Sequence, residues 1–190
     1  MNEAMIPSVK MSEKEEGLVD FLKMTGRLKR EPRRGWVLKA GVSNPESVAD
    51  HTFRLVLLSM VLGDLRGLNT EKMMKLAVIH DLGESLIGDI TPEDKDKVES
   101  KELDEVNAIN EVFSHLPDTL RESYSRLWTE LGTSSSAEAK LVHDADKLEM
   151  ALQASEYMGE GYSKEMLSEF KVSAIQQIND SNLLDIIRLI

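Results

Sequence analysis

Histidine and carboxylate residues gather at the end of one apolar helical segment, AVIHDLGESLIGDITPED, which spans residues 77–94. The helical period carries the apolar face of this segment onto His80 and Glu84, with Asp81 beside them and Asp89 just beyond. A carboxylate in a protein core is costly unless a positive charge neutralises it. These residue types at this spacing therefore require a counter-charge.

No basic residue of this region provides that charge. Lys75 is the only Lys or Arg from residue 73 to residue 94, and it faces away from the apolar face. The chain has no cysteine, which excludes disulfides and thiolate ligands. A divalent cation is then the economical counter-charge, because imidazole and carboxylate ligands together suit Mn, Fe, Co, Ni or Zn, and suit Mg less well.

A second histidine faces inward on the preceding helical segment. His51 lies on the same face as Val48 and Leu55, three residues after one and four before the other. A lone inward histidine is more often a core residue with satisfied hydrogen bonds than a metal ligand. Two inward histidines beside an aspartate favour metal binding instead, which makes His51, His80 and Asp81 candidate ligands.

A fourth ligand has to come from a distant segment, because an octahedral or trigonal-bipyramidal ion needs more than three ligands. The segment KLVHDADKLEMALQASEY offers Asp144 and Asp146, which flank the apolar face of its helix on opposite sides at similar angles. Periodicity alone does not choose between them. His143 points away from that face and is expected at the surface.

The elements that must position these residues are helical. Nearly every segment has helical rather than alternating periodicity, which predicts an all-α single domain, residues 1–190, with about six to eight helices. The stretch PRRGWVLKAGVSNP is expected to be an irregular connection, and the first ~11 residues are expected to be disordered. The helices are expected at about residues 12–30, 44–62, 71–86, 94–116, 120–131 and 135–158, followed by one or two more. Capping boxes predict the starts of the first and the last of these six, formed by Ser12 with Glu15 and by Ser135 with Glu138.

Charge and composition limit the partners. A net charge of -11 argues against binding to a nucleic-acid polymer, because its phosphates would be repelled. No apolar run reaches the ~18 residues of a membrane span, and the N-terminal residues lack the pattern of a secretory signal. The absence of cysteine favours a cytoplasmic protein. The apolar C-terminal stretch LLDIIRLI is either a surface for a partner or a last helix packed on its own core.

Four segments, taken in order, resemble the HD-domain metal-dependent phosphohydrolases and, within that superfamily, the 5'-deoxynucleotidases. They are GWVLKAGVSNPESVADH, VIHDLGESLIGDITP, SSSAEAKLVHDADKLEM and QASEY. A His-Asp pair alone is a weak signal, since such pairs occur by chance. The order of the four segments carries the resemblance, which covers roughly residues 18–158.

This resemblance implies an HD-domain helical bundle with assigned site residues. Glu84 would activate water or relay a proton, and Asp89 would act beside the phosphate. The arginine that grips the substrate precedes the Gly-Trp pair, and Arg33 fits that pattern better than Arg34. Trp36 would wall the nucleoside site, unless it is simply a core tryptophan. The implied metal ligands are His51, His80, Asp81 and Asp146.

The resemblance also implies the reaction, which is hydrolysis of nucleoside 5'-monophosphates with 2'-deoxy sugars preferred, by a homodimer. Three alternatives remain open at this point. The first is another HD-domain phosphohydrolase, which would act on dNTPs, ppGpp or cyclic dinucleotides. The others are a non-catalytic module that binds nucleotides through a structural metal, and a plain helical scaffold. Glu84 and Asp89 argue against the module, because a purely structural site needs no spare carboxylates.

Overall fold

The computed structural model describes residues 12–91 and 101–190, in which every regular element is a helix. The all-α prediction is confirmed. The helices are α1 (Glu13–Thr25), the 3₁₀ helix η1 (Gly26–Lys29), α2 (Arg34–Ala40), α3 (Val48–Arg66), α4 (Thr70–Ile79), α5 (Glu84–Ile87), α7 (Lys101–Ser114), α8 (Asp118–Gly132), α9 (Ala137–Gly159), α10 (Lys164–Gln177) and α11 (Ser181–Ile187). The division is finer than expected because short helices lie between the long ones.

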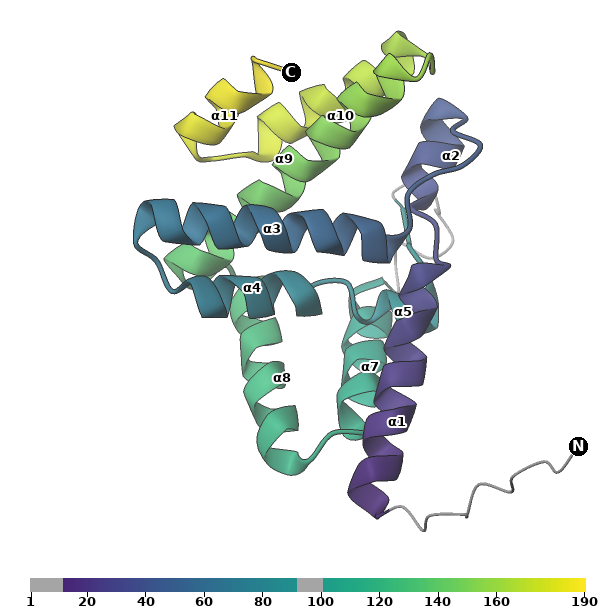
Figure 1. The fold of residues 1–190 in the computed structure, drawn as a ribbon, viewed down its shortest axis with the longest axis vertical. Helices are drawn as coiled ribbons and strands as arrows, with labels where there is room; N and C mark the ends of the chain where they lie inside the picture. The colour runs from purple at the N-terminus through teal and green to yellow at the C-terminus, as the bar shows by residue number, and fades with distance from the viewer. Residues whose placement is uncertain (1–11, 92–100) are drawn as a thin grey trace, which may run out of the picture.

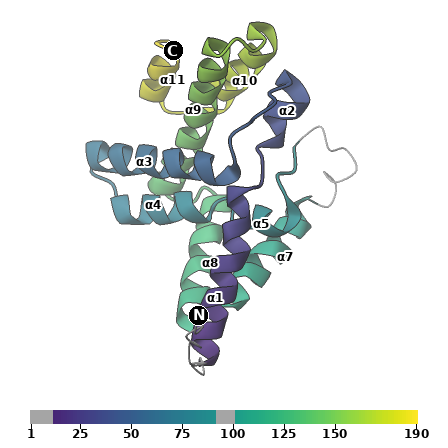
Figure 2. The ribbon, with the colours of Figure 1, turned by 45° about the vertical axis from the view of Figure 1, so that its right-hand side comes forward.

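The helices are arranged on both sides of a central pair. Helices α3 and α4 lie side by side across the middle, with α1, α7 and α8 below them and α2, α10 and α11 above (Figure 1). Helix α9 runs from the central pair into the upper group, and the same arrangement is seen after a 45° turn (Figure 2). The largest hydrophobic cluster joins α3, α4, α9 and α11. The long helix α9 therefore connects the central pair to the upper group.

Helix α4 ends earlier than the periodicity predicted. The expected helix over residues 71–86 is wrong in its second half, since α4 stops at Ile79 and a turn of four residues precedes the short helix α5. The N–H of Glu84 bonds the carbonyl of Asp81 at 3.0 Å within this turn. His80 and Asp81 therefore lie in the turn after α4 and not inside a helix. The directions of their side chains do not follow the helical period.

Helix α2 lies inside the stretch expected to be irregular, so that prediction is wrong. Its seven residues span two turns, which is too short for a period to show in the sequence. Burial of Trp36 and Ala40 holds it against α9 and α10. Gly41, with φ of 64°, ends the helix in the left-handed conformation that glycine adopts without strain.

The predicted start of α1 is confirmed, whereas α3 and α9 begin later than predicted. The capping box of Ser12 and Glu15 is confirmed at the start of α1. Helix α3 begins after Ser47, which forms a capping box with Asp50, and not at residue 44. The N-cap of α9 is Ser136 rather than Ser135, because the hydroxyl of Ser136 accepts the third N–H of the helix.

The remaining predictions concern the two ends and the segment before α7. The first 11 residues and the start of the helix expected over residues 94–116 lie outside the described residues. At the C-terminus, Leu183 and Ile187 are buried against the main cluster, which favours a last helix packed on its own core. Among the described residues, no helix is both long enough and apolar enough to cross a membrane.

Candidate metal centre and adjoining cavities

His51 is completely buried at the first turns of α3, and both of its ring nitrogens are engaged. Nδ1 lies 2.5 Å from a carboxylate oxygen of Glu149 on α9. A carboxylate can only accept a hydrogen bond, so Nδ1 carries the proton. Nε2 lies 3.1 Å from Oδ1 of Asp146 and 3.3 Å from Nε2 of His80. Because Nδ1 keeps its proton, Nε2 is the ring atom that a metal ion on the side of His80 could bind, in place of a proton.

His80 has the same arrangement, although it comes from a different element. Its Nδ1 lies 2.8 Å from the carbonyl oxygen of Ala77, so this nitrogen also carries its proton. Its Nε2 lies 2.7 Å from Oδ2 of Asp81 and faces Nε2 of His51. Ligand atoms of His51, His80 and Asp81 lie within 4.8 Å of one another. Two imidazole nitrogens and a carboxylate oxygen so arranged suit a divalent transition metal.

Asp146 and Asp144 have different environments, which distinguishes two residues that periodicity left equivalent. Asp146 turns one oxygen toward His51 and the other toward Lys147, whose Nζ is 2.8 Å away. Asp144 is buried on the other side of α9 and accepts the backbone N–H groups of Asn179 and Asp180 at 3.1 and 2.9 Å. Asp144 therefore anchors the segment that leads into α11 and takes no part in the centre.

Two cations approach the carboxylates of the centre from outside. Nη1 of Arg33 lies 3.2 Å from Oδ2 of Asp81, and Lys147 pairs with Asp146. Burial raises the pKa of Asp81, but His80 and Arg33 outweigh it and lower that pKa to about 2. Burial likewise raises the pKa of Asp146, while Lys147 and His51 hold it well below its usual value. Both carboxylates are therefore ionised at neutral pH, as metal ligands must be.

The pKa of His51 reflects this concentration of carboxylates. Burial lowers it, and the charge of Arg33 lowers it further. Hydrogen bonds to Asp146 and Glu149 outweigh both effects and raise the pKa to about 9. A proton and a metal ion would compete for the same Nε2 atom.

A network of polar residues on α3 and α9 holds His51 on the side that faces away from His80. Glu149 is fully buried and receives Nε of Arg54 at 2.8 Å on the oxygen that does not face His51. Arg54 also donates to Gln153 and Glu156 at 2.5 and 2.6 Å. The carboxylate of Glu149 is thus fixed by an arginine before it meets the imidazole, which holds His51 in one tautomer and one orientation.

Glu46 forms a second acidic group with His51 and Glu149, in which ligand atoms again lie within 4.8 Å of one another. This group suits a metal less well, because Arg54 already neutralises Glu149 and the Nδ1 atom of His51 carries a proton. Burial and the charge of Glu149 raise the pKa of Glu46 to about 7. Glu46 also accepts Nε1 of Trp36 at 3.0 Å.

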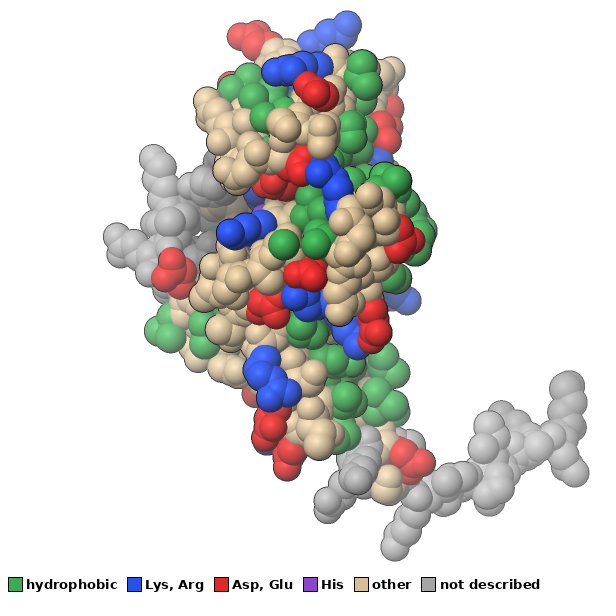
Figure 3. Space-filling model, turned by 90° about the vertical axis from the view of Figure 1, so that its left-hand side faces the viewer, with side chains coloured by type: hydrophobic (Ala, Val, Ile, Leu, Met, Phe, Trp, Pro, Cys, Tyr) green, Lys and Arg blue, Asp and Glu red, His purple; other side chains and the backbone are tan. Residues whose placement is uncertain are grey.

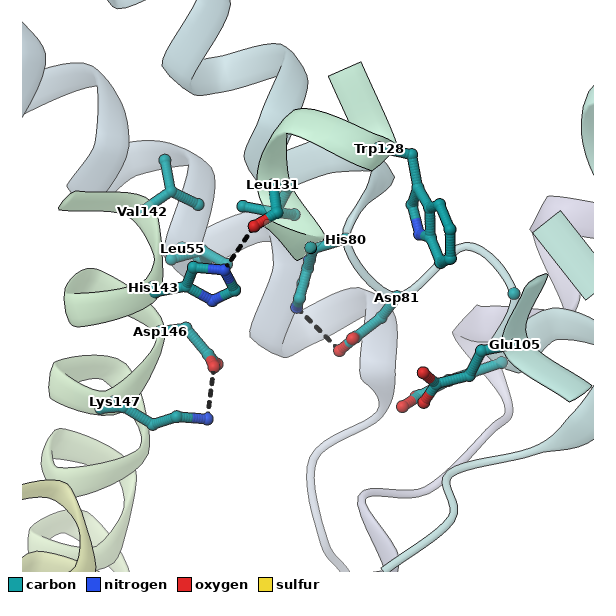
Figure 4. Close-up of a pocket in the computed structure, with 13 residues that line it drawn as sticks. Leu55, His80, Asp81, Glu105, Trp128, Leu131, Val142, His143, Asp146 and Lys147 are labelled. Atoms are coloured by element: carbon teal, nitrogen blue, oxygen red, sulfur yellow. Dashed lines mark hydrogen bonds and ion pairs between the residues drawn. The ribbon is translucent and has the colours of Figure 1, made fainter. Parts of the chain in front are cut away.

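Two cavities meet at the centre. One of about 350 Å³ opens toward α8, and the other of about 340 Å³ opens toward α2 and α10. Four residues line both cavities: Asp81, Glu84, Asp146 and Lys147. In the first cavity, the α9 side chains face His80 and Asp81 across the opening (Figure 4). A substrate in either cavity would therefore lie against the same carboxylates.

The second cavity contains most of the remaining residues predicted for the site. Arg33, Trp36 and Asp89 line it, whereas Arg34 does not. Arg34 instead donates its backbone N–H to Asp89 at 2.6 Å and its Nη1 to the carbonyl of Asp89 at 3.2 Å. Arg34 and Asp89 therefore hold the start of α2 against the loop after α5, while Arg33 points to the centre.

Trp36 serves in the core and borders the cavity at once. Its side chain is only 2% exposed and packs against Tyr157 and Phe170, with ring centroids 5.3 and 4.2 Å away. The interpretation as a core tryptophan is therefore confirmed, and its role beside a nucleoside stays a prediction. Trp36 and Phe170 both line this cavity.

The expectation that His143 lies at the surface is wrong. The ring is partly buried, its Nε2 lies 2.9 Å from the carbonyl of Leu131, and it lines the cavity near α8 (Figure 4). Helix α8 covers that side of α9. The period of one helix does not reveal which other helix packs against it. Lys147, Glu149 and Arg54 were not predicted from the sequence. Glu149 follows Asp146 by one helical turn, and Arg54 follows His51 by one turn, so the spacing contained a signal for both.

Comparisons with known proteins agree with this geometry. The HD domain family model matches residues 25–185. Human 5'-deoxynucleotidase HDDC2 is 40% identical over 170 residues, covering 90% of this chain and 82% of its own. The 5'-deoxynucleotidase hdd1 of Schizosaccharomyces pombe is 40% identical over 157 residues, covering 80% and 78%. A conserved hypothetical protein from Pyrococcus furiosus is 36% identical with a TM-score of 0.74, covering 90% of this chain and 96% of its own.

These matches span the central helices, both histidines, the His-Asp turn and α9. They extend beyond the part of the chain on which the sequence resemblance was based, because the family model also includes α10 and most of α11. The chain belongs to the HD-domain family and, within it, to the group of the HDDC2-type 5'-deoxynucleotidases.

Proposed function

We propose that this protein is a metal-dependent phosphatase that hydrolyses deoxynucleoside 5'-monophosphates. The observation that carries the proposal is the convergence of His51 and His80 Nε2 atoms, 3.3 Å apart, next to the carboxylates of Asp81 and Asp146. Curated relatives of this chain are named 5'-deoxynucleotidases. The geometry supports a metal site at these residues, and the names of the relatives support the substrate class.

The proposed metal ligands are His51, His80, Asp81 and Asp146. The donor set fits Mn, Co, Fe, Ni or Zn, since both imidazoles keep their protons on the far nitrogens and both carboxylates are ionised. When bound, such an ion supplies Lewis-acid activation of a phosphate ester and of water.

Arg33 is the proposed phosphate clamp. Its guanidinium lines the cavity between α2 and α10 and lies beside Asp81, and the neighbouring carboxylates keep it charged. A planar guanidinium can bind two phosphate oxygens at once, which an ammonium group cannot. This local positive charge also explains how a protein of net charge -11 would accept an anionic substrate.

Glu84 is the proposed acid or base of the reaction. Glu84 is the first residue of α5 and follows His80 by four positions. It lines both cavities, as Asp81 does. In hydrolysis, an oxygen of water forms a bond to phosphorus, the bond from phosphorus to the 5'-oxygen breaks, and the leaving oxygen receives a proton. A carboxylate at this position can take the proton from water or deliver one to the 5'-oxygen. Asp89 is proposed to act indirectly, by holding α2 and thereby Arg33.

A substrate panel tests the proposed function. Phosphate release would be measured from dAMP, dGMP and dUMP with added Mn²⁺ or Co²⁺, with AMP and dATP in parallel. We expect phosphate from the deoxynucleoside monophosphates, less from AMP, and no triphosphate from dATP. Triphosphate release would favour a triphosphohydrolase. Absence of any product, with intact nucleotide binding, would favour a non-catalytic module.

We also propose that the protein is a homodimer formed through one face of α3. Large apolar side chains are exposed there at helical spacing, with Phe53 67%, Leu57 41%, Val61 50% and Leu65 75% exposed. Hydrophobic side chains are also exposed among charged ones on the side of the molecule where α3 ends (Figure 3). Isolated apolar side chains are common on protein surfaces, but a continuous row of them is typical of an interface. A second copy of the chain, related by a two-fold axis, could cover this row with its own copy of the same row.

Light scattering on a sizing column tests the dimer. The wild-type chain should elute with twice the mass of its 21.3 kDa protomer. A Phe53→Glu, Leu57→Glu double variant should elute as a monomer, whereas Val172→Glu, at an apolar residue exposed on α10, should not change the mass. A monomeric wild-type protein would contradict the proposal.

A further inference from the structure

Lys147 occupies a special position next to the candidate metal centre. It follows Asp146 on α9, and its Nζ lies 2.8 Å from Oδ2 of that residue, while Oδ1 faces His51 at 3.1 Å. Its side chain is 31% exposed and lines both cavities. In the close-up, Lys147 and Asp146 lie across the cavity from His80 and Asp81 (Figure 4). The ammonium group therefore lies at the boundary between the centre and the space for a substrate.

Arg33 makes the corresponding contact on the other side. Its Nη1 lies 3.2 Å from Oδ2 of Asp81, and its side chain is less exposed than that of Lys147. Each of these two cations thus pairs with one of the two carboxylates proposed to bind the metal. Both line the 340 Å³ cavity between α2 and α10.

The charges around this cavity indicate what the two cations are for. Carboxylates outnumber cations among the described residues that line it, which would repel a phosphate dianion. The acidic residues of the lining are Asp81, Glu84, Asp89, Asp146 and Glu169, and the basic ones are Arg33, Lys39 and Lys147. A divalent ion bound to Asp81 and Asp146 would neutralise the charge of these two carboxylates, which are the partners of Arg33 and Lys147. The two side chains could then bind phosphate oxygens, since neither is needed any longer as a counter-charge.

We propose that Lys147 is a second phosphate-binding residue, which holds the phosphate of the nucleotide together with Arg33 once the metal is in place. This inference rests on the proposed function. Lys39 is less suited to the task, because its Nζ lies 5.6 Å above the ring of Phe170 at the α2 side of the cavity. Lys147 has a long unbranched side chain at the junction of both cavities, so it can follow the phosphate during the reaction.

Two variants and one control test the inference on the full-length protein. Lys147→Gln removes the charge and Lys147→Arg retains it, while Lys140→Gln changes an exposed lysine two turns earlier on the same helix. For each protein, Mn²⁺ binding alone and the binding of inorganic phosphate to the Mn²⁺-loaded protein would be measured by titration calorimetry. KM and kcat for dAMP would then be measured separately.

The expected result separates phosphate from metal. In Lys147→Gln, phosphate affinity should fall and KM should rise by roughly 10- to 100-fold, as for loss of a charge-assisted hydrogen bond. Mn²⁺ affinity should stay the same or increase, because Lys147 competes for Asp146. Lys147→Arg should recover most of the phosphate affinity, and Lys140→Gln should match the wild type.

Two results would overturn the inference. Phosphate affinity within about twofold of the wild type in Lys147→Gln would show that the lysine does not bind phosphate. A parallel loss of Mn²⁺ and phosphate binding would show that Lys147 acts only by holding Asp146. If the wild type fails to hydrolyse dAMP, the proposed function is wrong, but the phosphate titrations still decide the role of Lys147.

Discussion

Nε2 of His51 on α3 lies 3.3 Å from Nε2 of His80 in the turn after α4, although the two residues are 29 positions apart. Each ring donates its Nδ1 proton away from the other, to Glu149 in one case and to the carbonyl of Ala77 in the other. Because carboxylates raise the pKa of His51 to about 9, its Nε2 also carries a proton at neutral pH when no metal is bound. A divalent cation would take the place of that proton and bind both Nε2 atoms, which is the physical basis for the metal centre proposed here.

Asp81→Asn should abolish both metal binding and turnover. The amide of asparagine carries no charge, and the position lies between His80 and Arg33, so the centre would lose one of its two adjacent carboxylates. The metal content after dialysis and the phosphate released from dAMP would be measured. Thermal unfolding of the metal-free variant provides the control for folding, and a variant that keeps one equivalent of metal would contradict the assignment of Asp81.

Glu84→Ala should keep the metal and lose the reaction. Glu84 lines both cavities but is not among the proposed ligands, and loss of a general acid or base lowers kcat by about 10²- to 10⁴-fold. Metal content should remain at one equivalent, and KM should change much less than kcat. Loss of the metal in this variant would instead make Glu84 a ligand.

Glu149→Gln should weaken metal binding without unfolding the protein. Glu149 touches no substrate cavity in the structure, yet it fixes the tautomer of His51, and loss of such a partner typically lowers metal affinity by about 10- to 100-fold. Glu156→Gln is the matched control, because Glu156 also pairs with Arg54 but lies exposed at the other end of that network. Equal metal affinities in the two variants would show that Glu149 has a purely structural role.

An ion-pair network away from the site should make stability depend on pH. Lys72 on α4 lies 2.9 Å from Glu130 on α8 and 2.8 Å from Glu138 on α9. Hydrogen bonds, from Ser136 and Lys72 to Glu130 and from Lys72 to Glu138, lower both carboxylate pKa values. Carboxylates with lowered pKa values stabilise the fold above their unfolded pKa of 4.5 and lose this contribution as the pH falls through the folded pKa.

Lys72→Met should therefore lower the free energy of unfolding by about 1 kcal/mol at pH 7 and by much less near pH 3. Chemical denaturation at the two pH values measures the difference. Lys75→Met serves as the control, because Lys75 pairs only with exposed Glu71 one turn away on the same helix. A loss of the same size at both pH values would indicate that the packing of the lysine stem matters and not its charge.

The sequence was sufficient for the features that depend on one helix at a time. The inward position of His51 follows from its spacing to Val48 and Leu55, and burial of all three residues confirms it. The capping box at Ser12 was likewise local. These features depend on contacts three or four residues apart, which periodicity detects.

Features set by distant contacts could not be predicted in this way. Asp144 and Asp146 look equivalent on α9, and only the N–H groups of Asn179 and Asp180 and the position of His51 distinguish them. Helix α2 is too short for a period, and Asp89 holds its start from 55 positions away. The pairing of Arg33 with Asp81 spans 48 positions, so the residues around Asp81 in the sequence contain no sign of this counter-charge.

The central claim is that four side chains share one divalent ion, and anomalous diffraction from crystals grown with Mn²⁺ tests it most directly. We expect a single strong peak within about 2.0–2.3 Å of Nε2 of His51, Nε2 of His80 and carboxylate oxygens of Asp81 and Asp146. A peak at Glu46 and Glu149 on the other side of His51, or no peak at full Mn²⁺ saturation, would contradict the account.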